Sequence, residues 1–142
     1  MADIVELRNL SNEEIETLLD EMREEMFNLR FQKAAGSLEN TVRLRTVRRE
    51  IAQLNEVLGK RAWAVDELAS HADVAPLLND KEWAGAAKFD YEQAGWVVTL
   101  SDEDGNELAS GLVDLNMKRR STRRQRENVA PVQKVIEFEV AG

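Results

Sequence analysis

The side chains best suited to bind a ligand are arginines and lysines, which gather in two stretches of the chain. Residues 30–61 include eight basic and three acidic side chains, and residues 118–126 include six basic side chains and no acidic one. A guanidinium group can form two parallel charge-assisted hydrogen bonds with a phosphate group. These stretches therefore indicate binding of a phosphate-rich polymer, provided that folding places them on a surface.

Residues suited to catalysis or metal binding are scarce. The chain has no cysteine and a single histidine, so disulfides, thiolate zinc sites and histidine clusters are excluded. Glu137 and Glu139 would share one face of a strand, but no companion base accompanies them. We therefore expect no catalytic residue, no metal site, no cofactor and no small-molecule substrate. We expect four further side chains to be packing residues and not ligands, namely His71, Trp63, Trp83 and Trp96.

The composition limits the class of protein. The 142 residues include 19 basic and 27 acidic side chains, for a formal charge of −8, and 43% are hydrophobic. The charge is segregated, because residues 1–29 sum to −7, residues 30–61 to +5 and residues 62–117 to −10. No apolar stretch approaches the roughly 20 residues of a membrane span, and the first thirty residues resemble no targeting signal. We expect one or two small domains of a cytoplasmic protein that does not bind a membrane.

Two helices are expected before residue 61. Ser11 and Glu14 fit a capping box, so a helix begins at Ser11, and Gly36 can adopt the left-handed conformation that ends a helix. Apolar residues recur at three- and four-residue steps in both segments, which predicts one buried stripe on each helix. The stripes are Ile15, Leu18, Leu19, Met22, Met26 and Leu29 in the first helix, and Leu44, Val47, Ile51, Leu54 and Leu58 in the second.

A short polar turn at 37–40 separates the two stripes. Two amphipathic helices joined by a short loop predict an antiparallel helical hairpin over residues 1–61. The second stripe also fits a coiled coil, so a free protein–protein adaptor is an alternative interpretation. The basic flank of the second helix consists of Arg43, Arg45, Arg48, Arg49, Lys60 and Arg61.

Residues 62–142 form an acidic extension of different character. A helix can continue or restart over 62–78, and apolar and polar residues then alternate over 88–92, 96–101 and 136–140. An Asp-Gly turn at 102–106 leads into a further run over 107–115. We expect three or four antiparallel strands and an exposed basic loop at 118–126. The predicted fold class is α+β, a two-helix hairpin followed by a small antiparallel sheet.

The first part of the chain resembles a known family, bacterial ribosomal large-subunit protein twenty-nine. The segments that resemble it are LR at 7–8, SNEEI at 11–15, FNLRFQ at 27–32, GSLEN at 36–40 and RTVRREIA at 45–52. The resemblance covers residues 1–61. It implies a helical hairpin on large-subunit ribosomal RNA (rRNA) at the rim of the polypeptide exit tunnel. It also implies ribosomal protein twenty-three as a neighbour and a nascent-chain chaperone or targeting factor as a further partner.

The residues expected to contact rRNA follow from the resemblance and from their charge. Ser37 and Asn40 can instead be helix caps, and Asn28 and Gln32 can cap or face solvent. Arg48 and Arg49 point about 100 degrees apart on a helix, so one of them is expected to contact phosphate directly. The expected contacts are Asn28, Arg30, Gln32, Lys33, Ser37, Asn40, Arg45, Arg48 and Arg49, with Lys118, Arg119, Arg120, Arg123 and Arg124 in the extension.

Three surfaces have open interpretations. Phe27 and Phe31 are spaced for packing, although one of them can stack on an unpaired base. The acidic face of the first helix either faces solvent or offers a docking surface. The basic loop at 118–126 either anchors the extension to rRNA or is a solvated loop. We expect a structural, non-catalytic constituent of the large ribosomal subunit.

Overall fold

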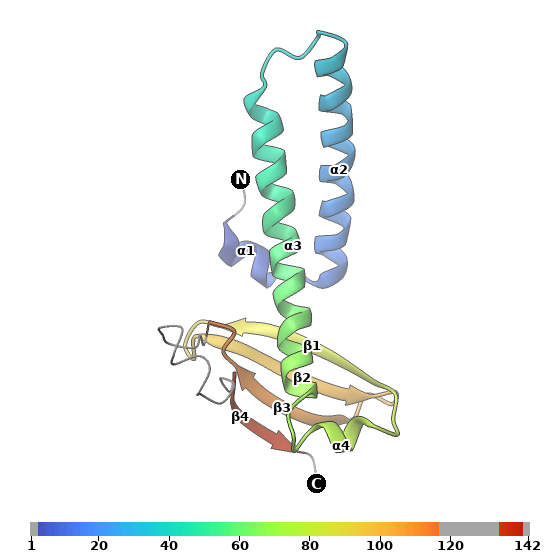
Figure 1. Cartoon of the computed structure of the whole chain (residues 1–142), viewed down its shortest axis with the longest axis vertical. Helices are drawn as coiled ribbons and strands as arrows, with labels where there is room; N and C mark the ends of the chain where they lie inside the picture. Colours follow the sequence, from blue (N-terminus) through green and yellow to red (C-terminus); the bar gives the residue numbers. More distant parts are fainter. Residues whose placement is uncertain (1–2, 117–133, 141–142) are drawn as a thin grey trace, which may run out of the picture. The chain divides into compact units, whose positions relative to one another are not determined.

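The computed structural model describes residues 3–116 and 134–140. Within these residues four helices precede four strands, which confirms the predicted α+β class (Figure 1). The chain divides between Gly59 and Lys60 into two compact units, here called the helical unit and the sheet unit. The predicted basic loop at 118–126 lies outside the described residues. The elements are α1 (Ile4–Asn9), α2 (Asn12–Ala34), α3 (Val42–Ala69), α4 (Ala75–Leu78), β1 (Trp83–Asp90), β2 (Gly95–Asp102), β3 (Glu107–Val113) and β4 (Val135–Val140).

The two predicted ends of α2 are confirmed. The Ser11 hydroxyl accepts a hydrogen bond from the Glu14 amide at 3.2 Å, and the Glu14 carboxylate accepts one from the Ser11 amide at 2.9 Å. At the other end Gly36 has φ +75°, and the Ser37 amide donates to the Gln32 carbonyl at 2.9 Å. This left-handed glycine satisfies carbonyl groups of the last turn, which fixes where the helix stops.

The apolar stripes of α2 and α3 pack against each other in two clusters. Near the start of α2, Ile15 and Leu19 pack with Leu54 and Val57 of α3. Near its end, Leu29 packs with Leu44 and Val47. The two helices therefore run antiparallel (Figure 1). Because the α3 stripe is covered by α2 of the same chain, it is occupied internally, which argues against the adaptor interpretation.

Two details of the helical unit differ from the prediction. Val57 is buried, with 1% of its surface exposed, whereas the predicted Leu58 is only partly buried. The short helix α1 was not predicted, because six residues give no periodicity to recognise. Its Leu7 is buried in the cluster of Ile15 and Leu54.

Among the helices that the structure describes, none is long and apolar enough to cross a membrane.

The sheet unit contains one antiparallel sheet with strand order β1-β2-β3-β4. Strands lie at the predicted runs over 96–101, 107–115 and 136–140, and the Asp102–Asn106 segment is the predicted turn, with Gly105 at φ +86°. The predicted alternation of buried and exposed residues is confirmed in β2. In β4 it is wrong, because Ile136, Phe138 and Val140 are exposed and only Val135 is buried. The first strand begins at Trp83, earlier than the predicted start near residue 88. The small residues at 84–87 alternate too weakly in hydrophobicity to reveal this strand from the sequence.

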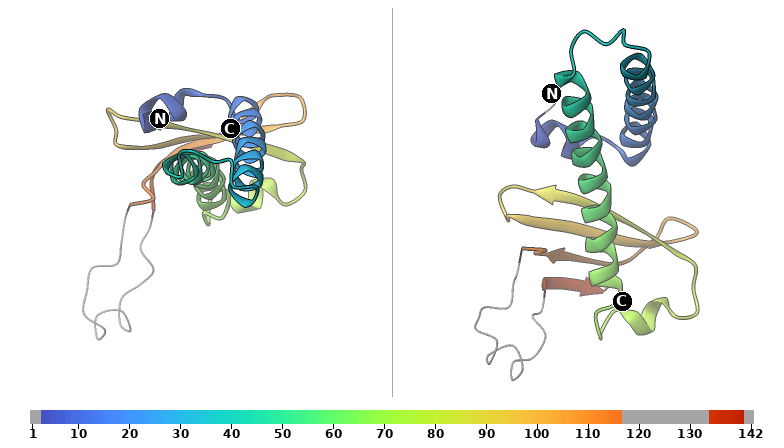
Figure 2. Two further views of the ribbon diagram at one scale, coloured as in Figure 1. Left: turned by 90° about the horizontal axis from the view of Figure 1, so that it is seen from above. Right: turned by 45° about the horizontal axis from the view of Figure 1, so that its top comes forward.

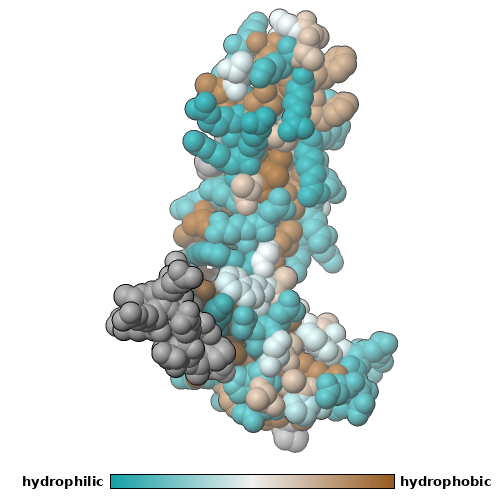
Figure 3. Space-filling view, in the orientation of Figure 1, coloured by the Kyte–Doolittle hydropathy of each residue, from teal (hydrophilic) through white to brown (hydrophobic). Residues whose placement is uncertain are grey.

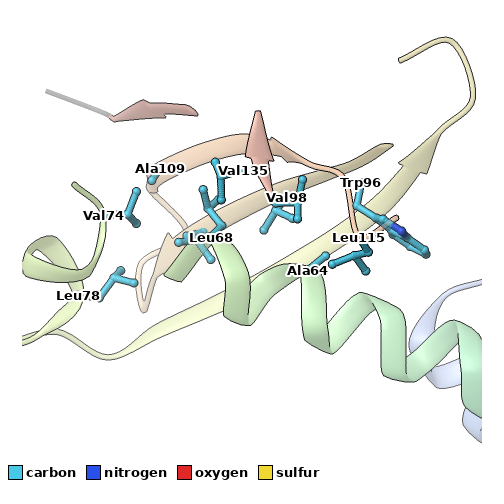
Figure 4. Close-up of a cluster of buried hydrophobic side chains, with 11 residues drawn as sticks. Ala64, Leu68, Val74, Leu78, Trp96, Val98, Ala109, Leu115 and Val135 are labelled. Carbon is cyan, nitrogen blue, oxygen red and sulfur yellow. The ribbon is translucent and has the colours of Figure 1, made fainter. Parts of the chain in front are cut away.

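One face of the sheet is covered by the last turns of α3, which continues without a break past residue 61 (Figure 2). Ala64 and Leu68 point toward Trp96 and Val98 of β2 in the core of this unit (Figure 4). Val74, which directly precedes α4, and Leu78 of α4 also contribute to this core. The expected helix over 62–78 is thus a continuation of α3 to Ala69, followed by the separate α4, which has Pro76 in its first turn.

The aromatic residues divide into buried and exposed ones. Trp96 is 3% exposed, as predicted, and His71 is half-buried with its ring 4.5 Å from the Phe138 ring. Trp63 and Trp83, which were also expected to be packing residues, are 41% and 37% exposed, so neither is a buried core residue.

Candidate nucleic-acid interface

The last two turns of α2 present the first group of expected contact residues. Asn28, Arg30, Gln32 and Lys33 are all exposed, whereas the intervening Leu29 is buried against α3. Burial of the leucine stripe fixes the rotation of the helix, so the polar residues between the leucines face solvent. The structure therefore places these four side chains where a large ligand can reach them.

The two loop residues form local hydrogen bonds. The Ser37 hydroxyl donates to the Gln32 carbonyl at 3.3 Å, and the Asn40 side-chain oxygen accepts from the Val42 amide at 3.0 Å. Both side chains thus satisfy backbone groups at helix ends, as the capping interpretation of Ser37 and Asn40 expects. Both residues also remain exposed. The side-chain nitrogen of Asn40 takes no part in the hydrogen bond with the Val42 amide.

The first turns of α3 present the arginines. Arg45, Arg48 and Arg49 are exposed, and they flank the buried Val47. Arg43 differs, because its Nε donates to the Glu25 carboxylate of α2 at 2.6 Å. This hydrogen bond, together with the charge of Glu25, raises the pKa of the Arg43 guanidinium above its ordinary value. Arg43 therefore stabilises the contact between the two helices.

The expected contact residues of the helical unit share one electrostatic property. Within residues 3–116 and 134–140, none of their cationic side chains forms an ion pair with a carboxylate. In contrast, Arg23 forms an ion pair with Asp20 at 3.4 Å. Arg61, at the other end of the predicted basic flank, is buried, and burial lowers the pKa of its guanidinium below its ordinary value. Among the expected contact residues of the helical unit, the exposed cations that can meet an external anion are Arg30, Lys33, Arg45, Arg48 and Arg49.

Apolar side chains are exposed among these cations. Phe27 and Phe31 of α2 are 67% and 69% exposed, which argues against the packing interpretation and leaves both rings accessible. They lie one turn apart and outside the stripe of Leu29, which explains why α3 does not cover them. Val42 at the start of α3 is 61% exposed and was missed by the sequence analysis. Figure 3 shows apolar residues exposed among hydrophilic ones over the loop end of the helical unit.

The acidic residues of α2 occupy a different part of the helical unit. Glu13, Glu14 and Glu16 are exposed in its first turns, and Glu21 and Glu24 are exposed farther along the helix. Basic residues dominate from Arg30 through the loop to Arg49. An elongated phosphate polymer is attracted to the loop end and repelled by the start of α2.

These side chains together can bind a structured polyanion. Guanidinium groups can bind phosphates, and exposed aromatic rings can stack on unpaired bases. The remaining expected contacts lie outside the described residues, namely Lys118, Arg119, Arg120, Arg123 and Arg124.

Comparison with known proteins identifies the same part of the chain. Residues 5–61 match the family described as "Ribosomal L29 protein". The chain is 50% identical to the large ribosomal subunit protein uL29 of Natranaerobius thermophilus over 56 residues, which cover 39% of this chain and 86% of that protein. It is 51% identical to uL29 of Corynebacterium diphtheriae over 63 residues, covering 44% and 83%. It is also 57% identical to uL29 of Rhodococcus erythropolis over 56 residues, covering 39% and 72%. Because this similarity spans most of each relative, the chain belongs to the ribosomal L29 family.

Proposed function

We propose that the protein is a structural constituent of the large ribosomal subunit and binds rRNA through its helical unit. Membership of the ribosomal L29 family supports this function. The observation on which the proposal depends is that five exposed cations near the α2–α3 loop have no carboxylate partner in the described structure. Such an arrangement costs Coulomb energy in the free protein, and a phosphate backbone relieves that cost.

The proposed contacts are mainly to the RNA backbone. The major groove of A-form RNA is too narrow for side chains, so phosphates and loop nucleotides are the accessible targets. Arg45 and at least one of Arg48 and Arg49 would bind phosphates from α3, and Arg30 and Lys33 would do so from α2. Ser37 and Asn40 would position the loop against the RNA, while Phe31 or Phe27 would stack on an unpaired base. Asn28 and Gln32 would add hydrogen bonds.

The proposed location is the rim of the polypeptide exit tunnel, beside ribosomal protein twenty-three, on ribosomes in the cytoplasm. In this placement the acidic residues of α2 face away from rRNA and offer a docking surface for a nascent-chain chaperone or targeting factor. We also propose that the extension from residue 62 onward lies at the ribosome surface. Its acidic sheet would be held off rRNA, and its basic residues at 118–126 would anchor it.

Sedimentation of the tagged chain through a sucrose gradient tests the proposed function. We expect it to comigrate with large subunits after a high-salt wash. Reversing the charge of Arg48 and Arg49 together, with Arg48→Glu and Arg49→Glu, should reduce the bound fraction at least about tenfold, since charge-assisted contacts contribute roughly 1.5–3 kcal/mol each. The matched control is Lys81→Glu with Lys88→Glu, which changes the net charge equally on exposed residues of the sheet unit.

Two results would contradict the proposal. Protein that stays at the top of the gradient would favour a free protein. Equal losses for the arginine and lysine pairs would show that net charge alone matters and that the α3 arginines have no specific role.

A further inference from the structure

A pocket in the sheet unit lies outside the proposed rRNA contacts. It is bounded by the end of α3, by α4 and by the start of β1, and its volume is about 570 Å³. This volume falls within the range of roughly 300–1,000 Å³ that is typical of small-ligand sites. The residues lining it are Asp66, Ala69, Ser70, Ala75, Leu78, Asn79 and Trp83.

The chemistry of the lining points to a cation with an apolar stem. Asp66 provides an exposed carboxylate, and Trp83 provides an indole that is 37% exposed. In the part of the chain that the structure describes, neither side chain has a hydrogen-bond or ion-pair partner. Ala69, Ala75 and Leu78 offer apolar surface, against which the methylene groups of a lysine or arginine can pack.

Elsewhere in the sheet unit, a tryptophan and a carboxylate already bind a lysine side chain. The Lys134 ammonium group lies 4.1 Å from the centre of the Trp63 ring and 3.8 Å from the Glu67 carboxylate. The Trp63 indole nitrogen in turn donates to Glu67 at 2.8 Å. A tryptophan and a carboxylate on α3 therefore hold a lysine through a cation–π contact and an ion pair. Asp66 and Trp83 supply the same two groups to the pocket.

We propose that this pocket binds a lysine or arginine side chain from a basic peptide segment of a neighbouring protein. The charge of this part of the sequence favours such a partner, because residues 62–117 have two basic and twelve acidic side chains. This charge attracts a basic segment and repels RNA. Ser70 and Asn79 add hydrogen-bonding groups that a peptide backbone can use. The inference does not depend on where the helical unit binds.

Nuclear magnetic resonance titration of the ¹⁵N-labelled full chain tests the proposal. The probe is a blocked Gly-Lys-Gly peptide, and the matched control peptide has norleucine in place of lysine. We expect the Trp83 indole and the Ser70 and Asn79 amide signals to shift with the lysine peptide, with a dissociation constant on the order of 1 mM. The norleucine peptide should cause no comparable shift, because it has the apolar stem without the charge.

Variants separate the roles of the two groups. Asp66→Asn should weaken binding about tenfold, whereas Glu92→Gln, which removes one exposed charge from the turn between β1 and β2, should leave it unchanged. Trp83→Leu should abolish the shifts of the Ser70 and Asn79 amides, and Trp83→Tyr should retain them, because tyrosine also presents a ring face to a cation.

Three outcomes would overturn the proposal. The first is equal binding of the lysine and norleucine peptides, and the second is equal weakening by Asp66→Asn and Glu92→Gln. The third is preferential binding of spermidine with the same dependence on Asp66, which would identify a free polyamine and not a peptide as the ligand. Unchanged signals elsewhere in the spectrum of each variant would show that the fold is intact.

Discussion

Single residues explain why α3 fits closely on the sheet. A Cβ atom at Gly111 would lie 2.7 Å from the Glu137 carbonyl oxygen and 2.9 Å from Leu68 Cδ1. A Cβ atom at Gly85 would collide with Val65 Cγ1. Glycine at these two positions leaves space for the side chains of α3 over β1 and β3, a requirement that no periodicity in the sequence reveals.

The first prediction concerns Gly111→Ala. The added methyl group meets the backbone of β4 and the side chain of Leu68, so we expect a loss of about 1–3 kcal/mol of unfolding free energy. Gly59→Ala is the control, because nothing lies within 4 Å of a Cβ atom there. That change removes a helical glycine from α3 and should stabilise by up to about 1 kcal/mol. Urea denaturation followed by tryptophan fluorescence measures both, and a Gly111→Ala protein as stable as the parent would refute the expected clash.

At the scale of elements, the pairing of α2 with α3 depends on little buried surface. One cluster has five buried residues and the other has three. Met22 and Ile51 are partly buried and contact both clusters, so they connect them. A domain of about sixty residues buries only about 60% of the surface of its unfolded chain, which gives marginal stability without further partners.

We therefore expect a fragment of residues 1–61 to be only partly ordered by itself. Its circular dichroism should show helix that melts broadly, without a cooperative transition well above ambient temperature. Addition of large-subunit rRNA should increase the helix signal, because a ligand that binds only the folded form stabilises it. A sharp, cooperative melt of the free fragment at high temperature would show that the helical unit needs no partner.

At the scale of the whole molecule, charge differs strongly between segments of the sequence. Residues 30–61 are basic, residues 62–117 are acidic, and residues 118–126 are again basic. Only the first of the two basic stretches is part of the described structure. If both stretches bind rRNA, the salt dependence of binding must report both of them.

Deleting residues 118–126 tests this contribution. Should the segment make about four phosphate contacts, the deletion will reduce the slope of log affinity against log salt by roughly 3 to 4 units. Replacing its six basic residues with glutamine should have the same effect without shortening the chain, which controls for loop length. Binding of the full chain to large-subunit rRNA at several salt concentrations gives the slope. An identical slope for parent and deletion would exclude the anchor and favour a solvated loop.

The sequence by itself determined the class of fold, the ends of α2, the apolar stripes and most of the strands. These features depend on capping residues, glycines and periodicities within a few positions along the chain. It also located the arginines of α3 and the family to which residues 5–61 belong. Local chemistry is sufficient for such features because the interacting groups are close in sequence.

Only the tertiary structure decided which of these side chains are available for binding. Arg43 is paired with Glu25, eighteen positions earlier, whereas Arg45, Arg48 and Arg49 remain exposed. Trp83 lines a pocket with Asp66 and does not enter the core. Exposure and pairing result from contacts between segments far apart in the sequence, and those contacts exist only after the helices and strands have packed.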